Sequence, residues 1–225
     1  MTAIFVTGTG TDIGKSFVAA GLIRHLRKIG RPVEALKPVV SGFDPDEPAA
    51  SDPGALLAAL GRAISHPEIE RISPWRFRAP LSPDLAAARE GRTLDYNQLI
   101  AFSQRCISAA KDVLLIEAVG GVMAPLDDRH TVLDWMTVLR IPVVLVTGSY
   151  LGTISHTLTA LHVLAQRNVE VSSIAVSETP GSAVSLSDST ITIGRFAVPI
   201  EVIGIPRLAD RNAEHPAFER MVKLL

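Results

Sequence analysis

The chain has 225 residues, of which 47% are hydrophobic and 20% charged, and its formal net charge is -1. This length and apolarity suit one large buried core, so we expect a single domain over residues 1–225. The near-zero net charge provides no general attraction to nucleic acid or to an anionic membrane surface, and we expect neither as a partner.

The N-terminus leads directly into a predicted strand, with no basic segment followed by a long apolar run. The apolar runs are also shorter than the about 20 residues that span a bilayer. The single cysteine, Cys106, cannot form an intramolecular disulfide, and we interpret it as an apolar packing residue. These features predict a cytoplasmic protein.

Short β-branched runs alternate with longer helical patterns along the chain. Strands are predicted over 3–7, 33–37, 112–117, 141–147, 169–176 and 200–205, and helices over 15–29, 52–60, 95–111 and 153–167. Either Ser51 or Asp52 is expected to cap the second helix. The segment 43–53 is rich in proline and aspartate, and we expect a mobile loop there.

Continuous Val, Ile and Leu runs are typical of strands that are covered on both faces. Their alternation with helices predicts a doubly wound α/β fold, in which helices flank a mainly parallel sheet, as in P-loop NTPases. Such sheets bind ligands beyond the carboxyl ends of their strands. The loops 8–14, 38–43, 118–125 and 148–155 are therefore expected on one surface.

The first of these loops, GTGTDIGKS over residues 8–16, follows a strand and opens a helix, as a phosphate-binding loop requires. Lys15 would reach the terminal phosphates, and Ser16 would ligate Mg²⁺. Five residues separate Gly8 from Gly14, where the common motif has four. A dinucleotide-binding turn with Glu34 as its ribose ligand is an alternative, but Lys15–Ser16 has no role in such a turn. A plain glycine-rich turn is a third possibility.

Further candidates lie at the predicted carboxyl edge of the sheet. Glu117 ends a strand beside the phosphate loop and is a magnesium ligand candidate. Asp52 is a weaker candidate, with a helix cap as its alternative. Lys37 could neutralise charge during phosphoryl transfer, although a surface lysine is the ordinary interpretation, and Ser41 could bind the same ligand. The start of the helix at Thr153 could attract an anion.

Taken together, the motifs resemble those of the dethiobiotin synthetases of biotin biosynthesis over most of the chain. The similar segments are FVTGTGTDIGKS with its extra residue, KPVVSG at 37–42, the Ser51–Asp52 pair, the proline-rich segment 74–83, EAVGG at 117–121, the Asp134–Trp135 pair, Gly152–Ile154 and Gly204–Leu208.

This resemblance implies an ATP- and Mg²⁺-dependent ligase. It would carboxylate 7,8-diaminononanoate with CO₂ or bicarbonate, activate the carbamate with the γ-phosphoryl group, and close the ureido ring of dethiobiotin. The products would be dethiobiotin, ADP and phosphate. The family also implies a homodimer with the site near the subunit interface.

Residue roles carried over from the family fall into three groups. The implied metal ligands are Ser16, Asp52 and Glu117. The implied catalytic and substrate-binding residues are Lys15, Lys37, Thr11, Ser41, Gly152, Thr153, Ile154 and Ser155. The nucleotide is expected to contact Asp12, Ile13, Gly14, Lys15, Ser16, Phe17, Asp52, Glu117, Ala118, Val119, Gly120, Ser177, Glu178, Pro206, Arg207 and Leu208.

Several positions depart from the family pattern. Ser177–Glu178 replaces the Asn–Asp pair that recognises adenine, so one hydroxyl stands where a two-sided amide is usual, and we expect weak discrimination among nucleotides. Ala118 replaces a glycine, Asp84 replaces a histidine, and Ser155 stands where asparagine is common.

Two other classes of P-loop protein are alternatives to the family that the motifs resemble. An amidotransferase would need a glutaminase domain with a cysteine nucleophile, for which the chain has no room. An ATP-switched partitioning protein of the MinD/ParA type would carry a second lysine early in the loop, where this chain has Thr9-Gly10-Thr11.

Overall fold

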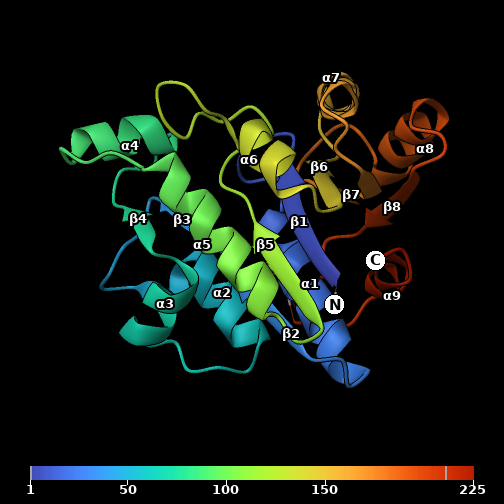
Figure 1. Ribbon diagram of the computed structural model, residues 1–225. Coiled ribbons are helices and arrows are strands. Elements are labelled where there is room, and N and C mark those ends of the chain that lie inside the picture. Colours follow the sequence, from blue (N-terminus) through green and yellow to red (C-terminus); the bar gives the residue numbers. More distant parts are fainter. Residues whose placement is uncertain (1, 211) are drawn as a thin grey trace.

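The computed structural model describes residues 2–210 and 212–225. Within these ranges, six strands form one sheet in the order β2-β5-β1-β6-β7-β8, and every pairing between them is parallel (Figure 1). The strands are β1 (Thr2–Gly8), β2 (Val33–Leu36), β5 (Val113–Glu117), β6 (Val143–Gly148), β7 (Val171–Ser177) and β8 (Glu201–Ile205). The predicted parallel α/β sheet is confirmed, with strand ends displaced by one or two residues.

Helices cover both faces of this sheet. On one face α1 (Lys15–Lys28) contacts α2 (Asp52–Ala59) and α9 (Pro216–Val222). The other face carries α5 (Tyr96–Ala109), α6 (Val132–Leu139), α7 (Thr153–Gln166) and α8 (Leu186–Phe196), which contact one another in the pairs α5–α6 and α7–α8. Figure 1 shows α5 and α6 in front of the strands and α1 behind them. Right-handed crossovers between parallel strands produce this arrangement.

A smaller unit, which the sequence patterns did not predict, lies beside the main sheet. Its strands β3 (Val39–Ser41) and β4 (Trp75–Phe77) pair in parallel, and η1 (Pro48–Ala50), α3 (His66–Ile72) and α4 (Pro83–Arg89) accompany them. The expected loop at 43–53 thus contains η1 and the start of α2. Ser51 caps α2, because its Oγ accepts a hydrogen bond from the backbone N–H of Gly54 at 3.2 Å, which leaves Asp52 as the first helical residue.

The Asp134–Trp135 pair has a structural role. Asp134 forms a capping box with Thr131 at the start of α6. Trp135 is fully buried and packs edge-on against Phe5 of β1, with ring centroids 4.8 Å apart. Its indole Nε1 donates to Ser103 Oγ at 3.1 Å, which satisfies the buried donor. This pair therefore anchors α6 and α5 to the sheet.

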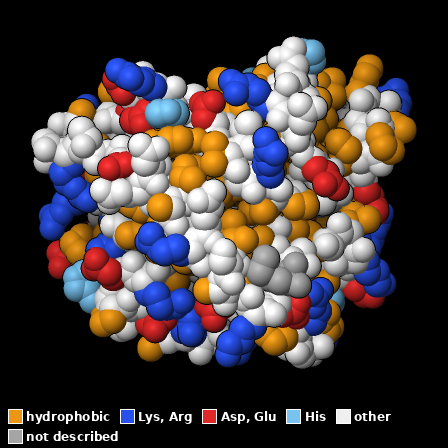
Figure 2. All heavy atoms as spheres, in the orientation of Figure 1, with side chains coloured by type: hydrophobic (Ala, Val, Ile, Leu, Met, Phe, Trp, Pro, Cys, Tyr) orange, Lys and Arg blue, Asp and Glu red, His pale blue; other side chains and the backbone are white. Residues whose placement is uncertain are grey.

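The exposed surface gives little indication of function. On the face that Figure 2 shows, basic and acidic side chains are interspersed. No helix in the described part of the chain combines the length and apolarity needed to cross a membrane.

The single cysteine, Cys106, packs against the core from α5. Burial raises the pKa of its thiol, which is consistent with a packing residue.

Two glycines inside helices provide a matched test of the core. A Cβ added to Gly21 of α1 would lie 2.2 Å from the ring of Phe218, whereas one added to Gly194 of α8 would meet Val202 at an ordinary 3.9 Å. Alanine gains about 1 kcal/mol over glycine within a helix, but overpacking costs about 1–3 kcal/mol. We expect Gly194→Ala to stabilise the fold and Gly21→Ala to destabilise it. Denaturant unfolding of both variants checks this, and stabilisation by Gly21→Ala would contradict the described packing.

Candidate active site

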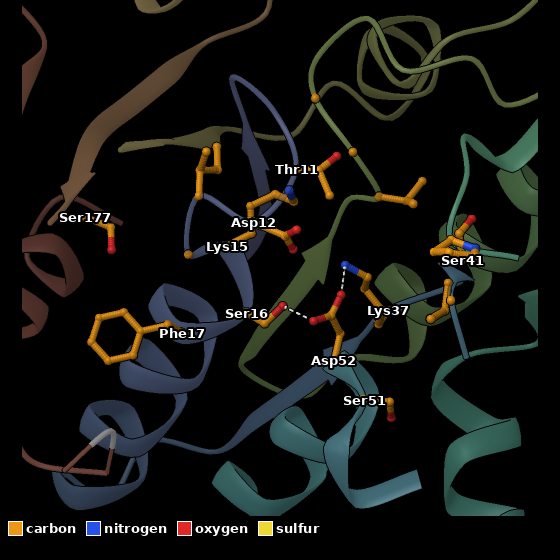
Figure 3. Close-up of a pocket in the computed structure, with 18 of the residues that line it drawn as sticks. Thr11, Asp12, Lys15, Ser16, Phe17, Lys37, Ser41, Ser51, Asp52 and Ser177 are labelled. Carbon is orange, nitrogen blue, oxygen red and sulfur yellow. Dashed lines mark hydrogen bonds and ion pairs between the residues drawn. The ribbon is translucent and has the colours of Figure 1, made fainter. Parts of the chain in front are cut away.

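A cavity of about 880 Å³ lies beyond the carboxyl ends of the strands. The predicted residues that line it are Thr11, Asp12, Ile13, Gly14, Lys15, Ser16, Phe17, Lys37, Ser41, Asp52, Val119, Gly120, Ser177, Glu178, Pro206, Arg207 and Leu208. Figure 3 shows Phe17 and Ser177 toward one side of the cavity and Ser41 on the other, with Lys37 and Asp52 between them. We name these two sides the Ser177 end and the Ser41 end.

The phosphate loop connects β1 to α1 along this cavity. Gly14 precedes α1 with φ 96°, a conformation that glycine adopts without strain, and a Cβ there would lie 2.8 Å from Ser177 Oγ. Lys15 is buried, and its Nζ donates to the carbonyl of Gly10 at 2.7 Å. Burial, followed by the charge of Lys37, lowers the pKa of Lys15 to about 8. An anionic ligand would favour its charged form.

Four side chains from four separate segments meet beside the loop, and we name them the carboxylate cluster: Ser16, Lys37, Asp52 and Glu117. The Ser16 hydroxyl lies 2.7 Å from Asp52 Oδ1 and 2.6 Å from Glu117 Oε1. The Lys37 ammonium lies 2.8 Å from Asp52 Oδ2 and 2.6 Å from Glu117 Oε1. It also donates to the carbonyl of Ala118 at 2.8 Å. Figure 3 shows how Asp52 bridges Ser16 and Lys37.

Burial and charge act against each other within the carboxylate cluster. The side chains of Lys37 and Glu117 are only 2% and 1% exposed. Burial raises the pKa of Glu117 despite the opposing charge of Lys37. For Lys37 and Asp52 burial also opposes ionisation, but the ion pairs outweigh it, so the pKa of Lys37 is raised and that of Asp52 is lowered. The interpretation of Lys37 as an ordinary surface lysine is therefore wrong. The interpretation of Asp52 as a helix cap is also wrong, because Ser51 caps α2.

Two buried oxygen atoms at the site lack hydrogen-bond partners among the described residues. They are Oε2 of Glu117 and Oγ of Ser41. Buried polar atoms are seldom left unpaired, because an unpaired group loses its hydration without compensation. Both atoms are therefore suited to contact a bound ligand. Carboxylate and hydroxyl oxygens in the carboxylate cluster are the ligand type that Mg²⁺ prefers, so the residues present fit that ion.

At the Ser177 end, two loops that follow β7 and β8 are joined by hydrogen bonds. Glu178 Oε2 accepts from the backbone N–H of Arg207 at 2.7 Å, and the N–H of Glu178 donates to Ile205. Phe17 faces this end and packs edge-on against Phe218, with centroids 5.9 Å apart. The Ser177 end therefore offers an aromatic ring, a hydroxyl and a carboxylate that is already partly engaged.

Some predicted residues lie elsewhere. Glu117 and Ala118 are buried directly behind the cavity lining, where Glu117 contacts Ser16 and Lys37 and the Ala118 carbonyl accepts from Lys37. Glu34, the ribose ligand of the dinucleotide alternative, pairs instead with Arg62 at 3.0 Å and Arg71 at 3.4 Å. It does not line the described cavity, so the dinucleotide alternative is wrong.

The segment Gly152, Thr153, Ile154 and Ser155 does not line the described cavity of its own chain. The Thr153 hydroxyl is buried and donates to the carbonyl of Gly148, so this side chain holds the loop in place. Ser155 is exposed in the first turn of α7, and the preceding Leu151 is 88% exposed. A ligand bound by this segment would therefore lie outside the described cavity of the same chain.

The sequence patterns also missed part of the lining. Gly42 and the segment Pro80, Leu81, Ser82 and Pro83 close the Ser41 end, and Thr179 and Pro180 border the Ser177 end. The proline-rich motif at 74–83 was the signal that could have assigned the first group. Its proline and serine side chains carry no charge, so their chemistry alone did not mark them as site residues.

Comparisons with known proteins agree with this geometry. A family model described as an AAA domain matches residues 2–214. The chain is 50% identical over 177 residues to the ATP-dependent dethiobiotin synthetase BioD of Acidiphilium cryptum (strain JF-5), covering 78% of this chain and 79% of that protein. It is 48% identical over 203 residues to the ATP-dependent dethiobiotin synthetase BioD of Methylobacterium nodulans (strain LMG 21967 / CNCM I-2342 / ORS 2060), covering 88% and 90%.

Among solved structures, the MinC:MinD cell division protein complex of Aquifex aeolicus contains a similar chain. Its TM-score is 0.56 at 13% identity, covering 100% of this chain and 93% of that chain. This similarity concerns the fold alone, whereas the two dethiobiotin synthetases are 50% and 48% identical to this chain over the aligned residues. The chain belongs to the family of ATP-dependent dethiobiotin synthetases.

Proposed function

We propose that this protein closes the ureido ring of dethiobiotin from 7,8-diaminononanoate, CO₂ and ATP, with Mg²⁺ bound at the carboxylate cluster. The observation that carries the proposal is the carboxylate cluster, which lies between the phosphate loop and the Ser41 end of the same cavity. Such a site can hold a triphosphate and a second substrate side by side, as phosphoryl transfer requires.

Ser16, Asp52 and Glu117 would hold the metal. The Ser16 hydroxyl lies within hydrogen-bond distance of both carboxylates, and Oε2 of Glu117 is buried without a partner among the described residues. Mg²⁺ usually binds one or two carboxylates together with water and substrate phosphates. When bound, it would neutralise phosphate charge and orient the terminal phosphoryl group.

The nucleotide would extend from the phosphate loop to the Ser177 end. Lys15 would turn from the Gly10 carbonyl to the phosphates, because an anion competes better than a neutral carbonyl for a buried ammonium. Phe17 would offer its ring to the base, while Ser177 and Glu178 would supply a hydroxyl and a carboxylate oxygen at its edge.

The diamine would lie at the Ser41 end. One substrate amine captures CO₂ as a carbamate, whose oxygen then attacks the γ-phosphorus of ATP with loss of ADP. The second amine attacks the carbonyl carbon of the resulting mixed anhydride, phosphate leaves, and the ring closes. Lys37 would neutralise the charge that develops on the carbamate and phosphoryl oxygens, and the unpartnered hydroxyl of Ser41 would donate to the carbamate. Thr11, which also lines the cavity, would help to position it.

The substrate carboxylate would be bound by the segment 152–155 of a second copy of the chain. This segment lies outside its own cavity, and the start of α7 at Gly152 carries no side-chain cap, so its N–H groups are suited to an anion. The strongly exposed Leu151 beside it favours burial in an interface. A homodimer is therefore part of the proposal.

The test is phosphate release by the purified protein with Mg-ATP. We expect release to require both 7,8-diaminononanoate and bicarbonate, and dethiobiotin to appear in equal amount, because the γ-phosphoryl group activates only a carbamate. Phosphate colorimetry and mass spectrometry of the product measure the two. Phosphate release at the same rate without the diamine would overturn the proposed function.

Weak selectivity for the base is a second expected property. The Ser177 hydroxyl replaces a two-sided amide, and one hydrogen bond contributes about 1 kcal/mol, or roughly fivefold in affinity. We expect turnover with CTP or GTP to stay within about tenfold of turnover with ATP. Ser177→Asn should increase the preference for ATP. Initial rates with each nucleotide measure this, and a strict ATP requirement in the unchanged protein would rule it out.

A further inference from the structure

Lys37 forms ion pairs with the two carboxylates that would ligate the metal. Its ammonium carries three N–H groups, and the structure provides three acceptors: Asp52 Oδ2 at 2.8 Å, Glu117 Oε1 at 2.6 Å and the Ala118 carbonyl at 2.8 Å. Two of these acceptors belong to the carboxylates that would ligate Mg²⁺. The ammonium is therefore the ion-pair partner of both acidic side chains among the described residues.

The ammonium and the metal compete for these carboxylates. Mg²⁺ binds its ligands at about 2.0–2.1 Å, and Lys37 already lies within hydrogen-bond distance of both carboxylates. Placing both cations there would bring like charges within a few ångströms in a buried site, where Coulomb repulsion is strong. Metal binding therefore favours departure of Lys37, and the ammonium then needs a new acceptor.

The Ser41 end offers a direction in which departure of Lys37 would serve the reaction. Figure 3 shows Lys37 between Asp52 and Ser41, and both Lys37 and Ser41 line the cavity. An anionic group bound at that end, beside the unpartnered Ser41 hydroxyl, would compensate the displaced ammonium. A metal–nucleotide complex brings a cation for the carboxylates and phosphate oxygens for the lysine together.

We propose that Lys37 is an exchangeable counter-ion of the carboxylate pair Asp52 and Glu117. It is held by them in the free protein and is displaced toward the Ser41 end when the metal–nucleotide complex binds. The carboxylates are thereby positioning residues for Lys37 as well as metal ligands. This inference rests on the proposed function, and it makes the catalytic ammonium available only after a metal–nucleotide complex has bound.

Metal binding without nucleotide tests the exchange. Mn²⁺ also prefers oxygen ligands, and electron paramagnetic resonance distinguishes its free and bound forms. We expect Lys37→Gln to bind Mn²⁺ about tenfold or more tightly than the unchanged protein, because the competing cation is gone. Lys28→Gln, which removes a lysine from an exposed ion pair with Glu214, should have no effect. Equal or weaker binding by the Lys37 variant would overturn the proposal.

Amine labelling of the unchanged protein provides a second test that does not depend on a variant. Acetylation by a water-soluble reagent is followed at Lys37 by peptide mass spectrometry, with exposed Lys223 as the internal reference. We expect labelling of Lys37 to rise about tenfold or more with Mg-ADP, because the released form becomes populated. ADP with a chelator should leave it protected. Equal protection in all three samples would overturn the proposal.

These outcomes are independent of catalysis because neither experiment contains the diamine. If Lys37 is released by Mg-ADP but phosphate release does not require 7,8-diaminononanoate, the exchange stands and the proposed function fails. If phosphate release is fully coupled to the diamine but Lys37 remains protected with Mg-ADP, the proposed function stands and the exchange fails.

Discussion

Replacement of Lys37 by alanine is expected to lower turnover by about 10²–10³-fold while ATP affinity changes by less than about tenfold. A buried ammonium that neutralises charge developing in the transition state contributes more to the chemical step than to ground-state binding. Lys37 is 2% exposed, so solvent screens it little. Steady-state rates and an independent nucleotide-binding titration measure the two quantities separately.

Lys223→Ala is the control for this prediction, because Lys223 forms an exposed pair with Glu219 on α9 and lies outside the cavity lining. It should leave both quantities unchanged. Losses of equal size in turnover and nucleotide affinity for Lys37→Ala would show that the residue contributes to binding alone. The transition-state role would then be wrong.

Replacement of Glu117 by alanine is expected to lower the free energy of unfolding by about 3 kcal/mol. Removing one member of a buried ion pair leaves the other charge less well compensated, because Lys37 would retain only the more exposed Asp52 as its carboxylate partner. The same change should abolish metal-dependent nucleotide binding, because the variant loses a buried metal ligand candidate. Urea unfolding without metal measures the first effect.

Two further variants test whether this loss of stability comes from the buried ion pair. Asp112→Ala removes the partner of Arg31 in a solvent-accessible pair, and solvent screening makes such pairs contribute far less than a buried pair. The double variant Glu117→Ala, Lys37→Met removes both buried charges and should recover most of the stability lost by Glu117→Ala. A loss for Glu117→Ala no larger than that for Asp112→Ala would contradict the buried pair.

The long elements of the fold could be predicted because their signals are local. Continuous apolar runs such as VVLV in β6 indicate buried strands, and the 14-residue helices α1, α5 and α7 extend over several turns. The shorter helices α3, α4 and α9 have seven residues each, too few for a clear period. The strand predicted over 33–37 corresponds to β2, which ends at Leu36, but the chain forms a further strand, β3, directly after Pro38 because β4 provides a pairing partner.

The phosphate loop was determined by the sequence itself, because its glycines, Lys15 and Ser16 are contiguous and act through local backbone geometry. The sequence by itself did not determine that Lys37 is buried and ion-paired. Its burial and its ion pairs depend on Glu117, 80 residues away in the chain, and on Asp52 at the start of α2. Only the parallel pairing of β2 with β5 brings these segments together, so tertiary structure decided that an ordinary-looking lysine lies at the centre of the site.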